Sequence, residues 1–237
     1  MAQNLKAAMA MEKVYRKLQD NRVAKDAFGY QDKLKRFGFS NTVEYERAKD
    51  EYYLKNSNIP VEFVNIRDLA AERAKAIAEK REVMHLITAD ETFVYAGNNC
   101  VDCDRDYIAK NNLFVFDYPG ASAIVATQYD LALGLVAKRL SLFPLVMERL
   151  NQSLRELGLD CYIEKNDILV AGNKIVGAGS YVQDGMLVCG IQISFVVDRE
   201  KITAICHKPV VKEPLGILEV SNVKRDNLIE KVKLWLL

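Results

Sequence analysis

The residues best suited to do chemistry lie between Asn166 and Tyr181, in the sequence NDILVAGNKIVGAGSY. The apolar run 168–170, followed by Ala171-Gly172-Asn173, which tolerate positive φ, predicts a hairpin. Lys174 then sits just past a tight turn. The stretch Gly177-Ala178-Gly179-Ser180 lacks bulky side chains, so its backbone N–H groups could approach a phosphate. The pattern suggests an anion site, although the spacing alone is more often that of an exposed lysine beside an ordinary hairpin.

The cysteines and histidines offer little further chemistry. The five cysteines, an odd number scattered over a long chain, argue against a secreted disulfide framework. Cys100 and Cys103 form a single CxxC, and neither a second pair nor a well-spaced histidine completes a zinc site. The two histidines, His85 and His207, are not near a serine or cysteine in a familiar nucleophile arrangement. We expect reduced thiols and packed or surface histidines.

Composition restricts the class of protein. Half of the 237 residues are hydrophobic, so the chain can bury a real core. The 33 basic and 32 acidic side chains nearly cancel, which argues against binding driven by a global field to nucleic acid or anionic membrane. No apolar run approaches the roughly 20 residues that span a bilayer, and the N-terminus lacks a signal-peptide pattern. We expect a cytoplasmic protein without a membrane partner.

Residues 1–57 differ from the rest of the chain. They are rich in Lys, Arg, Glu and Tyr, with apolar residues at helical spacing, and predict two or three amphipathic helices. Twelve basic against eight acidic residues give a net charge of +4, a modest excess typical of a solvated face. Asn58-Ile59-Pro60 marks a boundary, because proline disfavours a helix in the residue before it. We therefore predict a helical N-terminal extension, 1–57, and a second domain, 58–237.

The second domain alternates helices and strands. Helices are predicted over 66–81, 104–111 and 145–157, the last stopped by Gly158, and over 227–237. A hairpin is predicted from strands 83–88 and 92–96. Further strands are predicted at 113–116, 123–126, 131–136 and 186–197, with a shorter segment at 201–206. This order predicts an α+β fold with a largely antiparallel sheet packed with helices.

The order of these pieces resembles the lipoate-protein ligase and biotin-protein ligase superfamily, the lipoate branch in particular, over about residues 62–220. RDLAAERAKAIAEK is similar to the family's opening helix, and ETFVYAGNNCVDCDRDYIAKNNLFVFDY to its strand, Gly-x-Asn turn, helix and strand. NDILVAGNKIVGAGSY resembles the family's Asn-Asp, hairpin and Lys-x-x-Gly-x-Ala signature.

The resemblance implies that ATP and Mg²⁺ activate lipoate, octanoate or a similar small carboxylic acid, whose acyl group passes to a lysine of a lipoyl-type carrier protein. It implies that Lys174 bridges the acid's carboxylate and the α-phosphate of ATP, where a fixed cation stabilises the transition state. The remaining implied acid- and nucleotide-binding residues are Asn166, Asp167, Gly177, Ala178 and Gly179, with Asp167 as the metal ligand because a carboxylate suits Mg²⁺. Gly120, Ala121 and Ser122 are implied to line the same site.

The chain departs from the family in one loop. Where the family carries paired arginines, a Ser-Gly-Gly-Gly run and a Tyr-His, this chain has Asp117-Tyr118-Pro119-Gly120-Ala121-Ser122. This loss favours an alternative in which the protein is a catalytically inactive binding or assembly module with residues 1–57 as its docking arm. In a second alternative, Cys161 is the nucleophile of an ATP-independent lipoyl or octanoyl amidotransferase, since a thiolate near Lys174 could exchange thioesters. A packed strand cysteine is the simpler interpretation of Cys161.

Overall fold

The structure is a computed structural model that describes residues 2–20, 34–97, 103–118, 123–206 and 212–235. The chain divides into two compact units, Met1–Ser57 and Asn58–Leu237. The division falls where Asn58-Ile59-Pro60 predicts a boundary. The roles given to the two units, an extension and a catalytic domain, remain predictions. Among the described residues, no helix combines the length and apolar character that crossing a membrane requires.

The first unit is built from helices α1 (Ala2–Asp20) and α3 (Thr42–Asn56). Asn41 caps α3, because its side-chain oxygen accepts a hydrogen bond from the backbone N–H of Glu44 at 2.9 Å. The unit has a small core of its own, made by Leu5, Ala8, Leu34, Phe39 and Tyr45. Beside this core, Lys49 and Tyr45 both donate hydrogen bonds to the Glu12 carboxylate, at 2.8 and 2.9 Å.

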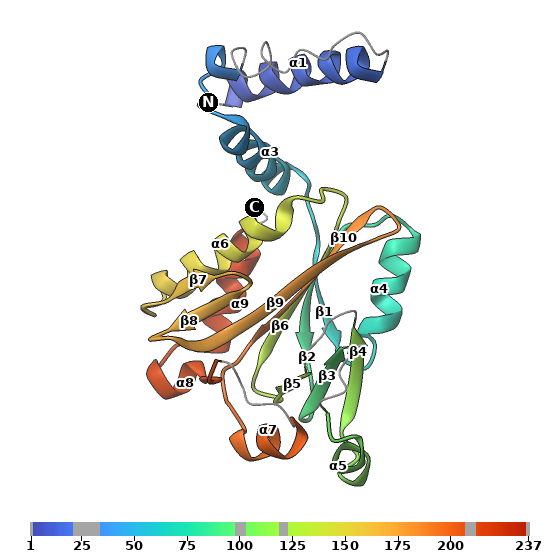
Figure 1. The fold of residues 1–237 in the computed structure, drawn as a ribbon, viewed down its shortest axis with the longest axis vertical. Helices are drawn as coiled ribbons and strands as arrows, with labels where there is room; N and C mark the ends of the chain where they lie inside the picture. Colours follow the sequence, from blue (N-terminus) through green and yellow to red (C-terminus); the bar gives the residue numbers. More distant parts are fainter. Residues whose placement is uncertain (1, 21–33, 98–102, 119–122, 207–211, 236–237) are drawn as a thin grey trace. The chain divides into compact units, whose positions relative to one another are not determined.

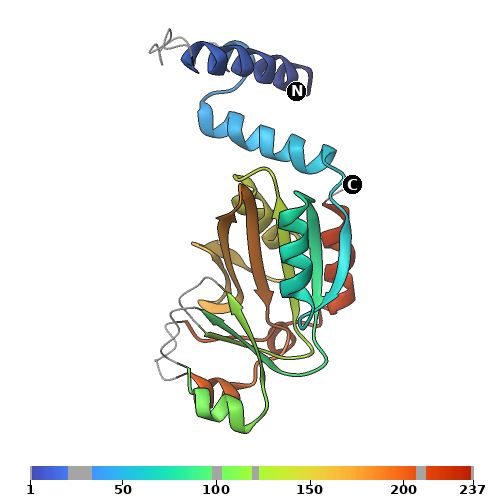
Figure 2. The ribbon, with the colours of Figure 1, turned by 90° about the vertical axis from the view of Figure 1, so that its right-hand side faces the viewer.

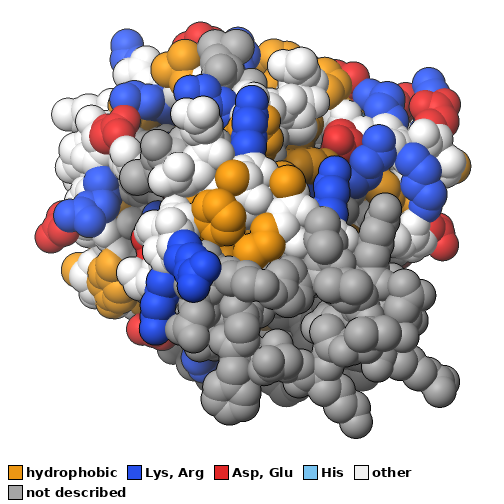
Figure 3. Space-filling view, turned by 90° about the horizontal axis from the view of Figure 1, so that it is seen from above, with side chains coloured by type: hydrophobic (Ala, Val, Ile, Leu, Met, Phe, Trp, Pro, Cys, Tyr) orange, Lys and Arg blue, Asp and Glu red, His pale blue; other side chains and the backbone are white. Residues whose placement is uncertain are grey.

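Basic and acidic side chains both lie on the face drawn in Figure 3, among apolar and neutral ones. On the described part of that face they do not gather by sign. This arrangement agrees with the near-zero net charge of the chain, and it gives a polyanion no extended basic stripe there.

A seven-stranded sheet forms the second unit, with strand order β1-β2-β6-β10-β9-β8-β7. Only β1 and β2 pair in parallel, and the remaining neighbours are antiparallel (Figure 1). The strands are β1 (Val61–Asn65), β2 (Val83–Thr88), β6 (Leu131–Ala137), β7 (Tyr162–Glu164), β8 (Asp167–Val170), β9 (Asn173–Gln183) and β10 (Met186–Ile193). The predicted α+β class with a largely antiparallel sheet is confirmed.

A second, three-stranded sheet has the order β4-β3-β5, from β3 (Phe93–Gly97), β4 (Phe114–Tyr118) and β5 (Ala123–Ala126). The predicted hairpin between strands 83–88 and 92–96 is therefore wrong. Both edges of β2 are taken, by β1 and β6, so β3 turns away and pairs with β4 and β5 instead. Phe93, Phe116 and Ala126 of the small sheet pack on Ile87 and Ala132 of the large one, which makes one continuous core.

Helices lie on both faces of the large sheet (Figures 1 and 2). Helix α4 (Leu69–Ala78) covers one face, and α6 (Leu142–Glu156) with α9 (Arg225–Leu234) covers the other. The shorter helices are α5 (Arg105–Lys110), α7 (Arg199–Ile205) and α8 (Ile217–Val220). Helix α6 ends as predicted at Gly158, whose φ of 97° lets Leu159 donate back to Leu154.

Two predicted boundaries need correction. Strand β10 ends at Ile193 rather than at Val197, because the N–H groups of Phe195 and Val196 donate to the carboxylate of Asp130 at 2.7 and 3.2 Å instead of joining the ladder. The shorter segment predicted at 201–206 is mostly helix α7. Asp198 begins that helix by accepting a hydrogen bond from Lys201 N–H at 3.0 Å.

Candidate active site

The hairpin predicted around Lys174 is present as β8 and β9. Ala171 and Gly172, with φ of 49° and 83°, form its two-residue turn, in which both central residues take positive φ. The main chain of Lys174 is held from outside the hairpin, because its N–H donates to Glu213 O at 2.8 Å and its carbonyl accepts from Leu215 N–H at 2.9 Å. The position of Lys174 is therefore fixed on both sides of its strand.

The glycine-rich stretch after Lys174 continues β9 and is not a loop. Gly177 pairs with Gln192 and Gly179 with Gly190 of β10, and Ala178 N–H donates to Asn166 O at 3.0 Å. These main-chain groups belong to the sheet, which disfavours the predicted cradle of free backbone donors. The glycines contribute space instead.

A row of glycines crosses the middle of the sheet. Gly134 of β6 pairs with Gly190 of β10, which pairs with Gly179 of β9. A Cβ added at Gly179 or Gly190 would meet no atom within 4 Å, and one added at Gly177 would lie 3.6 Å from the Lys174 ammonium nitrogen. Since paired residues project on the same face of a sheet, the row leaves an open floor beside Lys174.

This floor belongs to a pocket of about 300 Å³ in the second unit. The small sheet and α4 form its walls and roof. Its lining residues are Arg73, Ile87, Tyr95, Phe116, Tyr118, Ile124, Leu133, Asn166, Asp167, Lys174, Gly177, Ala178, Gly179, Ser180, Tyr181, Gly190, Ile191 and Gln192. A mostly apolar hollow with a few convergent polar groups is the usual form of a small-molecule site.

Of the predicted site residues, the structure brings together Asn166, Asp167, Lys174, Gly177, Ala178 and Gly179, which all line this pocket. Gly120, Ala121 and Ser122 lie outside the described residues. The roles of these residues remain predictions.

A cluster of charged side chains lies beside the hairpin of β8 and β9. The Lys174 ammonium lies 3.8 Å from Asp167, and Lys212 lies 3.0 Å from Asp167 and 2.8 Å from Glu164. The hydrogen bonds that Lys212 donates to the Glu164 and Asp167 carboxylates raise the pKa of Lys212 above its usual value. Lys212 was not predicted, since it is far from the hairpin in sequence.

Arg73 was not predicted as a site residue either. It lies on α4, where its guanidinium carbon is 5.3 Å from the Phe116 ring centre, a cation–π distance. One of its terminal nitrogens lies 3.8 Å from the position of a Cβ on Gly134. Among the described residues it has no acidic partner within ion-pair distance. An arginine at helical spacing from the buried residues Leu69, Ala76 and Ile77 was the signal that could have identified it.

Aromatic side chains make the wall contributed by the small sheet. The Tyr95 ring stands edge-on to Phe116 and Tyr118, with centres 5.7 and 6.2 Å apart. Burial raises the pKa of the Tyr95 phenol, so it is a neutral hydroxyl at physiological pH. The wall is aromatic, and it carries the phenol groups of Tyr95 and Tyr118.

Cys161, the alternative nucleophile, lies away from the pocket. Its side chain is 3% exposed, and its sulfur lies 3.8 Å from the carbonyl oxygen of Asn151 on α6. Burial raises the pKa of the Cys161 thiol to about 11, so almost none of it is thiolate near neutral pH. These properties disfavour the thioester route. The other predicted cysteine feature, the CxxC, includes Cys100, which lies outside the described residues.

The donor set for a metal ion is small. The described residues contain no group of three or more His, Cys, Asp or Glu side chains that could hold a metal. Asp167 is the one acidic residue in the pocket lining, and Asn166 adds an amide oxygen. These two ligands suit Mg²⁺ only where phosphate oxygens and water molecules complete the coordination shell of the ion. Mg²⁺ is usually bound in this way beside nucleotides.

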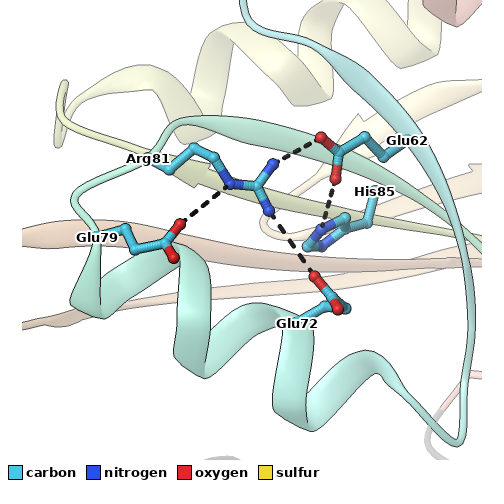
Figure 4. Close-up of polar contacts among 5 residues, drawn as sticks. All are labelled: Glu62, Glu72, Glu79, Arg81 and His85. Carbon is cyan, nitrogen blue, oxygen red and sulfur yellow. Dashed lines mark hydrogen bonds and ion pairs between the residues drawn. The ribbon is translucent and has the colours of Figure 1, made fainter.

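A buried histidine ends the glycine row. His85 of β2 pairs with Gly134 and is 1% exposed. Figure 4 shows its polar surroundings. Its Nε2 lies 3.9 Å from Glu62, and Arg81 links Glu62 to Glu72 and Glu79 at 2.6, 3.8 and 3.9 Å. Burial lowers the pKa of His85, against the opposing field of Glu62. The imidazole is therefore neutral at physiological pH.

No protein-family model matches the chain, and no curated protein matches it. Solved structures do. It is similar to a structure from a study of an archaeal lipoylation system, a bipartite lipoate protein ligase and its E2 lipoyl domain from Thermoplasma acidophilum, with 17% identity over 75% of this chain and 80% of that one and a TM-score of 0.62. It is similar to lipoate-protein ligase A bound with ATP, with 18% identity, 75% and 82% coverage and a TM-score of 0.62.

The P. falciparum protein LipL1 in complex with lipoate is also similar, with 11% identity over 75% of this chain and 60% of that one and a TM-score of 0.65. At these identities the likeness concerns the fold. This chain has the fold of the lipoate-protein ligases, which confirms the fold that the motif resemblance implies.

Proposed function

We propose that the second unit is a lipoate-protein-ligase-like enzyme. It activates a small carboxylic acid with ATP and transfers the acyl group to a lysine of a lipoyl-type carrier protein. The observation that carries this proposal is the fixed ammonium of Lys174 above the bare backbone of Gly177, in a pocket with an apolar wall. That arrangement offers a cation to an acid's carboxylate and leaves space for its chain.

The first step joins the acid to the nucleotide. A carboxylate oxygen attacks the α-phosphorus of ATP, the bond to the β-phosphate oxygen breaks, and pyrophosphate leaves. Negative charge gathers on the phosphorus oxygens in the transition state, where a positioned cation stabilises it more than it stabilises the ground state. Lys174 supplies this charge. Its main-chain hydrogen bonds with Glu213 and Leu215 hold the backbone from which its side chain extends.

Arg73 supplies the second cation. The family's paired arginines are missing from the loop 117–122, and Arg73 reaches the pocket from α4 without an acidic partner among the described residues. Its planar guanidinium is suited to phosphate oxygens. Asp167 and Asn166 would hold Mg²⁺, which when bound neutralises phosphate charge.

The second step passes the acyl group to the carrier. A neutral lysine amine of the carrier attacks the acyl carbon, a C–N bond forms, the mixed anhydride bond breaks, and AMP leaves with the electron pair. The neighbouring structures with ATP, with lipoate and with an E2 lipoyl domain support this choice of reactants.

Mass spectrometry of a lipoyl domain incubated with the protein, ATP and lipoate or octanoate tests the proposal. We expect an acyl-lysine adduct with wild type and a loss of about 100-fold or more in rate with Lys174→Gln. The matched control is Lys75→Gln, an exposed lysine on α4 outside the pocket. The ligase function is rejected if wild type forms neither adduct nor acyl-adenylate with an acid that it binds. It is also rejected if Lys174→Gln is as active as the control.

A further inference from the structure

Gln192 on β10 is a polar side chain without a partner. It is 4% exposed, and neither the nitrogen nor the oxygen of its carboxamide has a hydrogen-bond partner among the described residues. Buried side-chain amides in folded proteins are nearly always paired, because an unpaired donor and acceptor lose their bonds to water. Gln192 lines the pocket, so a ligand is the natural source of the missing bonds.

The two register partners of Gln192 do not supply them. On the same face of the sheet it lies between Ala132 of β6 and Gly177 of β9, its two register partners. Neither has a polar side chain that could turn towards the amide. Two residues along β10 lies Gly190, which has no side chain at all. Within the part of the chain that the structure describes, no group pairs with the Gln192 carboxamide.

Gln192 also lies close to the proposed reaction centre. The Lys174 ammonium is 3.6 Å from the position of a Cβ on Gly177, and paired residues on neighbouring strands have Cβ atoms about 5 Å apart. A ligand whose carboxylate meets Lys174 therefore has the first few atoms of its chain beside Gln192. An aliphatic chain would place methylene groups there.

We propose that the acid bound in this pocket carries an amide, or another adjoining donor and acceptor, within a few bonds of its carboxylate, and that Gln192 recognises it. A carboxamide is both donor and acceptor, and a second amide satisfies both with one group. The inference rests on the proposed function in one respect, that Lys174 receives the carboxylate. It assigns the substrate to the class of N-acyl amino acids and related amide-bearing acids rather than to plain fatty acids.

Calorimetric titration without ATP tests this with two probes, octanoate and N-pentanoylglycine. Their chains have the same length, and the second has an amide where the first has two methylene groups beyond the α-carbon. We expect wild type to bind N-pentanoylglycine about 10- to 100-fold more tightly, the cost of leaving a buried amide unpaired. Gln192→Leu should reverse the order, binding octanoate more tightly than wild type does.

Gln183→Leu is the control, because Gln183 ends β9, is exposed and does not line the pocket. It should keep the wild-type preference. Gln192→Met serves in the same way if Gln192→Leu does not fold. The ratio of the affinities of wild type for the two probes can be measured without any variant.

Equal affinities of wild type for the two probes, a preference for octanoate, or no binding of either would overturn the proposal. A Gln192 variant that weakens both probes equally would do the same. Failure of the ligase function is distinguishable, because it appears in the adenylate and carrier assays, while the preference between probes is measured with the acid alone.

Discussion

The ammonium nitrogen of Lys174 lies 3.8 Å from a carboxylate oxygen of Asp167, across the hairpin that joins β8 and β9. Asp167 accepts a hydrogen bond from Lys212 as well, at 3.0 Å. Asp167 therefore faces two ammonium groups, while Glu164 gives Lys212 a second carboxylate at 2.8 Å, so the charges of the cluster balance. Asp167 limits the repulsion between the two lysines, and an incoming carboxylate or phosphate can meet the Lys174 ammonium, which shares Asp167 with Lys212.

Asp167→Asn tests the positioning of Lys174. The amide keeps the shape but removes the charge that orients both lysines, so we expect a fall of about 10- to 100-fold in adenylate formation with little change in melting temperature. Pyrophosphate release measures the rate. Glu164→Gln is the control, because Glu164 contacts the same Lys212 at 2.8 Å but does not line the pocket. Equal rates for the two variants would remove Asp167 from the site.

Arg73→Gln tests whether an arginine on α4 replaces those missing from the loop 117–122. Losing a cation aimed at phosphate should weaken ATP binding by about 10-fold or more and leave acid binding nearly unchanged. Titration with ATP and with the acid separates the two effects. Arg67→Gln is a close control, since Arg67 also lies over a phenylalanine, Phe114 at 4.9 Å, but outside the pocket. Unchanged ATP affinity in Arg73→Gln would assign Arg73 to packing alone.

Local sequence predicted the parts of this site that are local in the chain. The hairpin around Lys174 follows from two adjacent residues that accept positive φ between apolar runs, and the structure has that turn at Ala171 and Gly172. The end of α6 before Gly158 follows from a similar local rule, the preference for glycine just after the last residue of a helix. Such features need only a few neighbouring residues, and those residues are contiguous.

The parts that sequence did not predict depend on pairing between distant strands. The glycine row exists only because β6, β10 and β9 are neighbours in register, and the chain order does not give that register. Gln192 faces the pocket because of this strand pairing. Arg73 reaches the pocket because its helix, α4, covers one face of the sheet (Figure 1). The absence of bulky side chains in the stretch 177–180 predicts backbone N–H groups that can approach a phosphate, but pairing with β10 and the hydrogen bond from Ala178 to Asn166 hold this stretch in the sheet.

The glycine row gives a prediction that separates binding from folding. A Cβ on Gly190 would meet nothing within 4 Å, so Gly190→Ala should fold with little change in melting temperature. Its methyl group would stand on the pocket floor, and we expect acid binding to weaken about 10-fold, with Gly190→Leu abolishing it. Thermal denaturation and acid titration measure the two properties.

Gly216→Ala is the contrasting variant. Its Cβ would lie 2.8 Å from the backbone oxygen of Phe195, so the main chain has to move and the protein should lose about 1–3 kcal/mol of stability. Gly216 does not line the pocket. If Gly190→Ala proved as destabilising as Gly216→Ala, the open floor described for the sheet would be incorrect.

His85 gives a prediction for the dependence of stability on pH. Burial lowers its pKa in the folded protein below the unfolded value of about 6.5, so the unfolded chain binds a proton more readily. The stabilisation from a neutral His85 is therefore complete above pH ~6.5 and is lost as the pH falls below that value. The slope for one proton cannot exceed about 1.4 kcal/mol per pH unit.

Two variants isolate the contribution of His85. His85→Leu removes the titrating group, so its unfolding free energy should fall less than that of wild type between about pH 6.5 and 5. Glu62→Gln removes the carboxylate 3.9 Å from Nε2, whose field raises the pKa of His85, so its acid sensitivity should increase. Urea denaturation at a series of pH values measures both. Parallel curves for wild type and His85→Leu would show that the imidazole is not a source of acid sensitivity.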